Sequence, residues 1–228
     1  MEVSPGERAT GALSPAKLEA LAAEFRRDGV VVLRSVIPDD ELALLRPRML
    51  SDAAALAARR AQHTGSRSDS GRKGHIWLGP PRAGPWVRPC FVANAIIEQV
   101  ARVLLGGERV ALAAYAGQCA LPGSSLIRWH MDGRWEHATA QEAAEAGCPW
   151  PSRTTSLHVN FNVLDVHAGN GATEIYRGSH HELGGGDAWK LKKTDPPPEL
   201  LEQRARHTPP VPNAFPAGAC AFRDARVW

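Results

Sequence analysis

The sequence predicts an α+β fold in which N-terminal helices pack on a double-stranded β-helix, the jelly-roll or cupin-like arrangement of two sheets. Apolar residues recur at helical spacing in residues 1–108, whereas short runs of strand-forming residues follow in residues 109–228. Helices followed by strands are typical of α+β proteins. Strands with long connections suit two packed sheets, an arrangement that limits exposed edge strands. We therefore expect the 228 residues to form a single domain.

The first half contains clear helix boundaries. Ser14 and Pro15 have the residue types of an N-cap and a first helical turn, and Gly29 is a typical residue after a helix end. Pro47 is expected to kink or divide the second helix. The expected elements are a loose tail over residues 1–13, helices over 14–28, 38–56 and 92–105, a strand over 30–33, and a long lid-like loop over 63–90.

The second half contains its best strand at residues 154–166, where apolar and polar side chains alternate. Such a strand packs one face on a core and can line a wet cavity with the other. Leu157, Val159, Phe161 and Val163 share one face, and His158, Asn160, Asn162 and Leu164 share the other. The remaining expected elements are strands over 110–115, 126–130, 172–176 and 219–228, a short helical insertion over 134–150, and a loop over 182–210.

Composition excludes several classes of protein. The net charge of +3 comes from scattered basic residues, so we expect no nucleic-acid partner. The four Cys residues include no Cys-x-x-Cys pair, which argues against a zinc site and a disulfide framework. The N-terminus has no apolar signal segment and no run is long enough to span a membrane, so we expect a cytoplasmic protein. The sequence contains no signal of oligomeric state.

One short motif, Trp129-His130-Met131-Asp132, can bind a metal. In an extended strand, residues two apart point the same way, so His130 and Asp132 would reach one ion together. Imidazole and carboxylate ligands suit non-haem iron(II), which uses two His and one carboxylate on one face. Chance alone supplies about 0.4 such His-x-Asp pairs in a chain of this composition, so a solvated loop is the alternative.

Several segments around this motif resemble the phytanoyl-CoA dioxygenase-like proteins. The resemblance runs from about residue 15 to Trp228, and Arg177 stands where the family usually has Pro. The segments that carry it are residues 25–33 (FRRDGVVVL), 38–42 (PDDEL), 129–132 (WHMD), 164–165 (LD), 170–172 (NGA), 177–180 (RGSH), 216–218 (PAG) and 222–224 (FRD).

This resemblance implies an iron(II)- and 2-oxoglutarate-dependent dioxygenase. Such an enzyme hydroxylates a C–H bond of a small-molecule substrate with O2 and converts 2-oxoglutarate to succinate. His130 and Asp132 would be metal ligands, and Gln118 and Asn160 would contact the co-substrate. The family's third ligand, a His, directly follows the segment that ends here at Trp228, and an Arg that binds 2-oxoglutarate comes a short way further on. Either the sequence is a fragment or the protein is a natural truncation. We expect a fragment whose reading frame continues past Trp228 with these residues, since residues 1–228 alone offer two metal ligands and would be inactive if the third is required.

Two alternatives stay open at the level of the sequence. The chain could be a non-catalytic jelly-roll protein that binds a small molecule and lacks a complete metal site. His158, His180 and His181 could also complete the metal site, although a capping or surface role explains His180 better, because it matches the family's Ser-His pair after a turn. The identity of the substrate depends on loop residues, which carry no recognisable signature.

Overall fold

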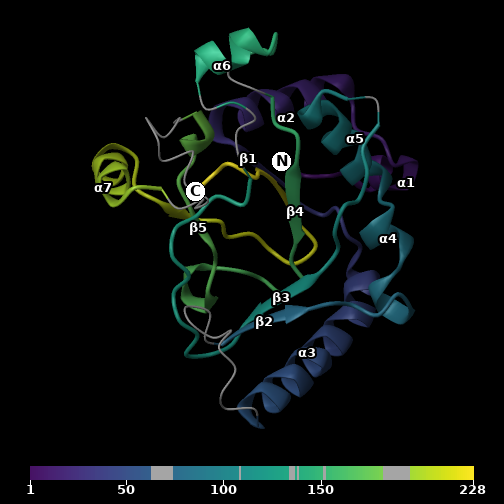
Figure 1. Cartoon of the computed structure of the whole chain (residues 1–228). Coiled ribbons are helices and arrows are strands. Elements are labelled where there is room, and N and C mark those ends of the chain that lie inside the picture. The colour runs from purple at the N-terminus through teal and green to yellow at the C-terminus, as the bar shows by residue number, and fades with distance from the viewer. Residues whose placement is uncertain (63–73, 108, 134–136, 138, 151–152, 182–195) are drawn as a thin grey trace. The chain divides into compact units, whose positions relative to one another are not determined.

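The computed structural model of the chain describes residues 1–62, 74–107, 109–133, 137, 139–150, 153–181 and 196–228. These residues form two compact units. The first contains Met1–Val36, Ala95–Val110 and Trp129–Trp228, and the second contains Ile37–Asn94 and Ala111–Arg128. Helices and antiparallel strands occur in both units, which confirms the predicted α+β class (Figure 1).

The first unit contains most of the strands. Its elements are α1 (Pro5–Thr10), α2 (Pro15–Asp28), β1 (Val30–Leu33), α5 (Ala95–Leu105), α6 (Ala140–Glu145), β4 (Leu157–Phe161), η3 (Ala168–Asn170), β5 (Glu174–Ile175), η4 (Ser179–His181), α7 (Pro198–His207), β6 (Val211–Pro212) and β7 (Cys220–Asp224). The elements of the second unit are α3 (Asp39–Gln62), β2 (His75–Leu78), η2 (Gly84–Trp86), α4 (Pro89–Val92) and β3 (Gly117–Ala120).

The central sheet of the first unit has the order β1-β7-β4, so the last strand of the chain lies in its middle (Figure 1). Phe222 of β7 pairs with Val31 and Val159, and it is fully buried. The next residue, Arg223, pairs with His158 of β4. Because successive strand residues point to opposite faces, Arg223 and His158 share the face opposite Phe222. This second face is the one that carries the candidate site.

The sequence predictions for α2 and β1 are confirmed. Ser14 caps α2 by accepting a hydrogen bond from the amide of Lys17. Gly29 ends the helix in the left-handed conformation, with φ of 70°. A Cβ atom at this position would overlap the side chains of Val227 and His180, so only Gly fits there. The helix therefore ends where the chain must pass close to the turn after β7.

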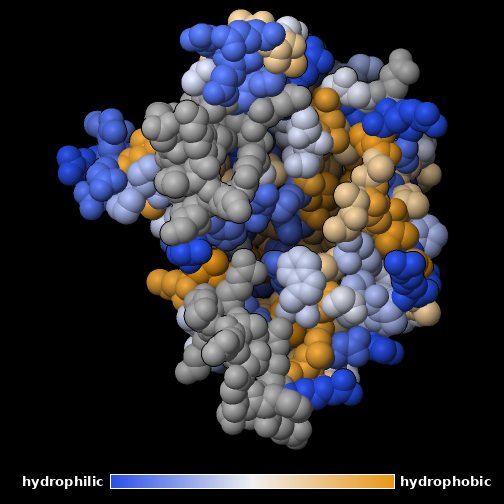
Figure 2. Space-filling view, in the orientation of Figure 1, coloured by the Kyte–Doolittle hydropathy of each residue, from blue (hydrophilic) through white to orange (hydrophobic). Residues whose placement is uncertain are grey.

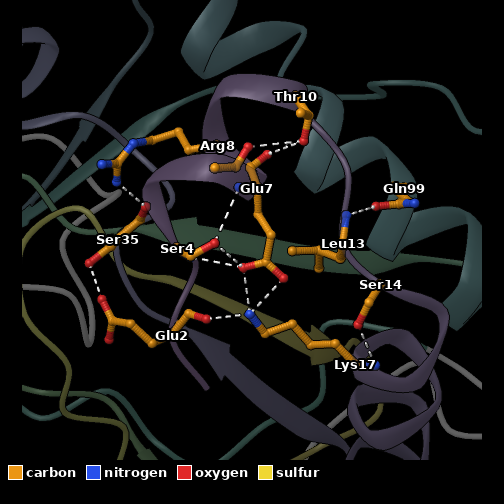
Figure 3. A network of polar contacts seen from close by, with 11 residues as sticks. Glu2, Ser4, Glu7, Arg8, Thr10, Leu13, Ser14, Lys17, Ser35 and Gln99 are labelled. Atoms are coloured by element: carbon orange, nitrogen blue, oxygen red, sulfur yellow. Dashed lines mark hydrogen bonds and ion pairs between the residues drawn. The ribbon is translucent and has the colours of Figure 1, made fainter.

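The N-terminal segment is folded, so the prediction of a loose tail is wrong. The Ser4 hydroxyl accepts a hydrogen bond from the Glu7 amide, and the Glu7 carboxylate accepts one from Lys17 at 2.7 Å (Figure 3). The amide of Val3 donates to the carbonyl of Arg34 at 3.0 Å, which places the segment beside the end of β1. Val3 is buried, and this burial offsets the entropy of ordering a short polar segment.

Other boundaries differ from the sequence predictions. Residues 110–115 and 126–130 form no strand, and β3 lies between them. The described part of the predicted loop over 63–90 contains β2, η2 and the start of α4, and the described part of the loop over 182–210 contains α7. The other residues of both loops lie outside the described residues. Pro47 lies inside α3, which continues through it as one helix instead of being divided.

Two helices are notable for their surfaces. No residue of α7 is buried, and Figure 2 shows hydrophilic residues over most of this helix. By contrast, α5 buries Ile96, Val100 and Ala101 and contacts α2.

Among the described residues, no helix has both the length and the apolar character that crossing a lipid bilayer requires.

His180 is buried and contacts the C-terminal end of α2. Its Nε2 donates to the carbonyl of Arg26 at 3.2 Å, and its ring lies 3.9 Å from the ring of His181. Its Nδ1 atom is buried without a hydrogen-bond partner in the structure. Burial, followed by the charge of the neighbouring His181, lowers the pKa of His180 to about 4. His180 therefore has a structural role in this conformation.

The stability of the protein should fall as the pH is lowered through the titration range of His180. The unfolded chain takes up a proton below its ordinary pKa of 6.5, whereas the folded protein does so only near pH 4. We expect this group to remove about 3 kcal/mol from the free energy of unfolding between pH 7 and pH 4. Urea titrations at several pH values would measure it.

Two variants separate His180 from the other groups that titrate in this range. His180→Gln keeps a donor for the Arg26 carbonyl and should flatten the pH dependence, whereas the exposed His207→Gln should keep it. An unchanged pH dependence in His180→Gln would contradict the assignment.

Candidate metal centre

The backbone of the His-x-Asp motif is fixed by the turn that follows β7. The amides of Asp132 and Gly133 both donate to the carbonyl of Ala225, at 2.9 and 2.7 Å. A Cβ atom on Gly133 would lie 2.6 Å from the Cβ of Ala225, so the two backbones approach closely. Hydrogen bonding and close packing together therefore hold Asp132 against the end of the central strand.

A buried ion pair stabilises this turn. Arg226 donates from Nε to one oxygen of Asp224 at 2.8 Å and from Nη2 to the other at 2.6 Å. Thr154 donates to the same carboxylate, and Asp224 is fully buried. Burial raises the pKa of Asp224, but the hydrogen bonds and charge of Arg226 outweigh it, so the pKa is lowered overall. The carboxylate is thus ionised and fully bonded within the turn.

His130 and Asp132 lie side by side at the site. The Nε2 atom of His130 is 3.3 Å from Oδ1 of Asp132, and both side chains are about one-third exposed. Two ligands at right angles, each about 2.1 Å from an ion, are about 3 Å apart. This pair therefore fits two adjacent positions of a metal such as iron(II). The described residues contain no group of three or more His, Cys, Asp or Glu side chains that could hold a metal ion.

The second oxygen of Asp132 has different neighbours. Arg223 donates from Nη2 to Oδ2, and Nδ1 of His158 is 3.3 Å from the same oxygen. Nδ1 of His158 also lies 3.1 Å from Nη2 of Arg223. A neutral imidazole carries one ring proton, so Nδ1 can accept from Arg223 or, in the other tautomer, donate to Asp132. The carboxylate thus has one side toward His130 and another toward a cation.

These contacts keep Asp132 ionised. Burial alone raises the pKa of its carboxyl group. Hydrogen bonds from His130, His158 and Arg223 outweigh this effect and hold the pKa far below its usual value. An ionised carboxylate is the form that binds a metal, so the surroundings of Asp132 suit this role.

The two residues predicted to contact a co-substrate lie in different units. Asn160 is an exposed residue of β4, two positions from His158 and on the same face of the strand. Gln118 is an exposed residue of β3 in the second unit, where it pairs with Trp77. Both assignments stay predictions.

The sequence interpretation gave no role to Arg223. The alternation of residues 154–166 placed His158 and Asn160 on one face, but it gave no information about which strand lies beside them. Pairing of β4 with β7 brings Arg223 opposite His158. The two strands are separated by about 60 residues of chain, so no local pattern could identify this neighbour.

Comparison with known proteins gives structural matches only. No model of a protein family matches the chain, and no curated protein sequence matches it. The structure of EctD from S. alaskensis in its apoform is 23% identical with a TM-score of 0.56, and the match covers 94% of this chain and 69% of EctD. EctD with 2-oxoglutarate and 5-hydroxyectoine is 21% identical, with a TM-score of 0.51 and coverage of 94% and 68%.

EvdMO1 is a third structural match. It is 19% identical, with a TM-score of 0.55, and the match covers 92% of this chain and 44% of EvdMO1. Identities this low show a shared fold and leave the chemistry of this chain to its own residues. The predicted fold class, α+β with a double-stranded β-helix core, is confirmed by this likeness and by the short antiparallel sheets.

Proposed function

We propose that this protein is an iron(II)- and 2-oxoglutarate-dependent dioxygenase that hydroxylates a C–H bond of a small molecule. The observation that carries the proposal is the 3.3 Å separation of His130 Nε2 and Asp132 Oδ1. It occurs on a fold shared with EctD, a protein that binds 2-oxoglutarate and 5-hydroxyectoine in its own structure. The resemblance of the surrounding segments to phytanoyl-CoA dioxygenase-like proteins supports the same class.

Each residue of the site has a defined part in this proposal. His130 and Asp132 hold the metal through a neutral nitrogen and a charged oxygen, which is the ligand chemistry that iron(II) takes in such enzymes. Asn160 lies on the same face as His158 and could donate to a bound carboxylate. When bound, iron and 2-oxoglutarate supply the oxidation, in which O2 hydroxylates the substrate and succinate and CO2 are released.

Turnover of 2-oxoglutarate by the purified full-length protein tests this proposal. We expect succinate to form when iron(II), 2-oxoglutarate and O2 are present together and not when the metal is removed by a chelator. Asp132→Ala should reduce succinate to the background level, because the variant loses the charged ligand. Quantification of succinate by mass spectrometry would measure both.

The matched control is Asp40→Ala, which removes an exposed carboxylate from the first turn of α3. This variant should keep the wild-type rate. Equal succinate formation by Asp132→Ala and wild type would refute the assignment of the ligand. Absence of metal-dependent turnover in wild type would favour a non-catalytic binding protein.

A further inference from the structure

Arg223 is more enclosed than the two side chains that it contacts at the site. Only 14% of its side chain is exposed, compared with 30% for Asp132 and 40% for His158. Its Nη2 contacts Oδ2 of Asp132 and Nδ1 of His158, while Nη1 donates to the carbonyl of Val227 at 3.2 Å. The guanidinium is therefore bonded to backbone on one side and to the carboxylate on the other.

Val227, whose carbonyl accepts from Arg223, is held in place by burial and a hydrogen bond. Val227 is fully buried, and its amide donates to the carbonyl of Asp224 at 3.1 Å, which closes the turn after β7. The same turn binds the amides of Asp132 and Gly133 through Ala225. One turn thus fixes both the backbone of the metal motif and the guanidinium that contacts the Asp132 side chain.

The two oxygens of Asp132 consequently face different partners. Oδ1 lies beside Nε2 of His130, whereas Oδ2 contacts the positive charge of Arg223. A guanidinium repels a divalent cation, so the side of Oδ2 is unfavourable for a metal. Oδ1, the oxygen beside His130, is therefore the favourable one for binding the metal.

We propose that Arg223 is a positioning residue that turns Asp132 so that a single oxygen, Oδ1, binds the metal. This inference rests on the proposed function, because it assigns the iron ligand used there. Groups that hydrogen-bond a metal ligand orient it, and their loss costs roughly 10–100-fold in metal affinity. Without Arg223, the carboxylate can rotate or bind the ion through both oxygens.

Loss of charge and loss of orientation have opposite effects on affinity. Removal of a neighbouring positive charge would by itself tighten binding of a dication. Removal of an orienting contact weakens it. The positioning role therefore predicts that Arg223→Met binds metal about 10–100-fold more weakly, whereas a purely electrostatic role predicts tighter binding.

The experiment compares four forms of the full-length protein: wild type, Arg223→Met, Arg223→Lys and Arg102→Met. Arg102 is a half-exposed residue of α5 that pairs with Glu98, so its replacement controls for the loss of one positive charge. Anaerobic titration with iron(II) gives the affinity. Infrared difference spectra are recorded on metal addition with protein labelled with 13C-aspartate. They give the separation between the two carboxylate stretching bands of Asp132. This separation is wider when one oxygen binds the metal than when both do.

We expect a wide separation in wild type and Arg102→Met, and a narrow one with weakened affinity in Arg223→Met. Arg223→Lys keeps a charged donor and should lie near wild type. If the Met variant does not fold, Arg223→Gln, which can still donate to Val227, replaces it. The role of Arg223 would be overturned if the neutral variant had the iron affinity and the band separation of wild type, or if it bound iron more tightly. Either result would leave the proposed function intact. A wild-type protein that binds no iron would overturn both.

Discussion

Replacement of Asp224 by Asn should lower the free energy of unfolding by about 3–5 kcal/mol, because it leaves a buried guanidinium without its counter-ion. The side chain of Arg226 is only 8% exposed and that of Asp224 only 1%, so water cannot substitute for the lost charge. An amide has one acceptor oxygen, whereas the carboxylate accepts from Nε, Nη2 and the backbone amide of Arg226 and from Thr154.

Urea denaturation at neutral pH would measure this loss. The matched control removes both charges, as in Asp224→Leu combined with Arg226→Met. Buried ion pairs can often be replaced by apolar residues of similar volume at little cost, so the double variant should be more stable than Asp224→Asn. A loss below about 1 kcal/mol in Asp224→Asn would show that the pair contributes as little as an exposed one.

Replacement of Gly133 by Ala should impair the metal centre more than it impairs the fold. The new methyl group would meet the Cβ of Ala225 at 2.6 Å and the carbonyl carbon of Ala225 at 3.3 Å. The motif must move away, and the two hydrogen bonds to the Ala225 carbonyl lengthen. Displacement of a functional group by about 1 Å can cost on the order of 100-fold in activity. We expect a loss of this size in succinate formation.

Two further variants test this explanation of the Gly133 effect. Gly6→Ala is the control, since a Cβ atom on Gly6 would meet no atom within 4 Å. Combining Gly133→Ala with Ala225→Gly removes the closest clash and should restore part of the activity. Failure of the second change to restore any activity would show that the contact with Ala225 is not the cause.

Local signals in the sequence were sufficient for part of the fold. The cap residues Ser14 and Gly29 located α2, because each satisfies backbone groups within its own helix end. The tail at residues 1–13 could not be predicted in this way. Its order depends on the burial of Val3 and on the hydrogen bond from the Val3 amide to the Arg34 carbonyl, and composition reveals neither. The proline-rich surroundings of α7 suggested only loop, although Pro198 occupies the first turn of this helix.

Local sequence signals also predicted only part of the candidate site. The spacing of His130 and Asp132 predicted that their side chains lie together, and they do, although the strand expected over residues 126–130 is absent. The turn at Ala225, and not a strand, holds them in place. Arg223 reaches the site through strand pairing between residues distant in sequence, so its role required the structure.

We propose that His130 and Asp132 bind one iron(II) ion together. Anaerobic iron(II) titration of the full-length wild type and of the His130→Ala and Asp132→Ala variants, each with 2-oxoglutarate, would measure this binding. We expect one equivalent of tightly bound iron in wild type and a large loss of affinity in both variants. Binding of iron by both variants with wild-type affinity would contradict it.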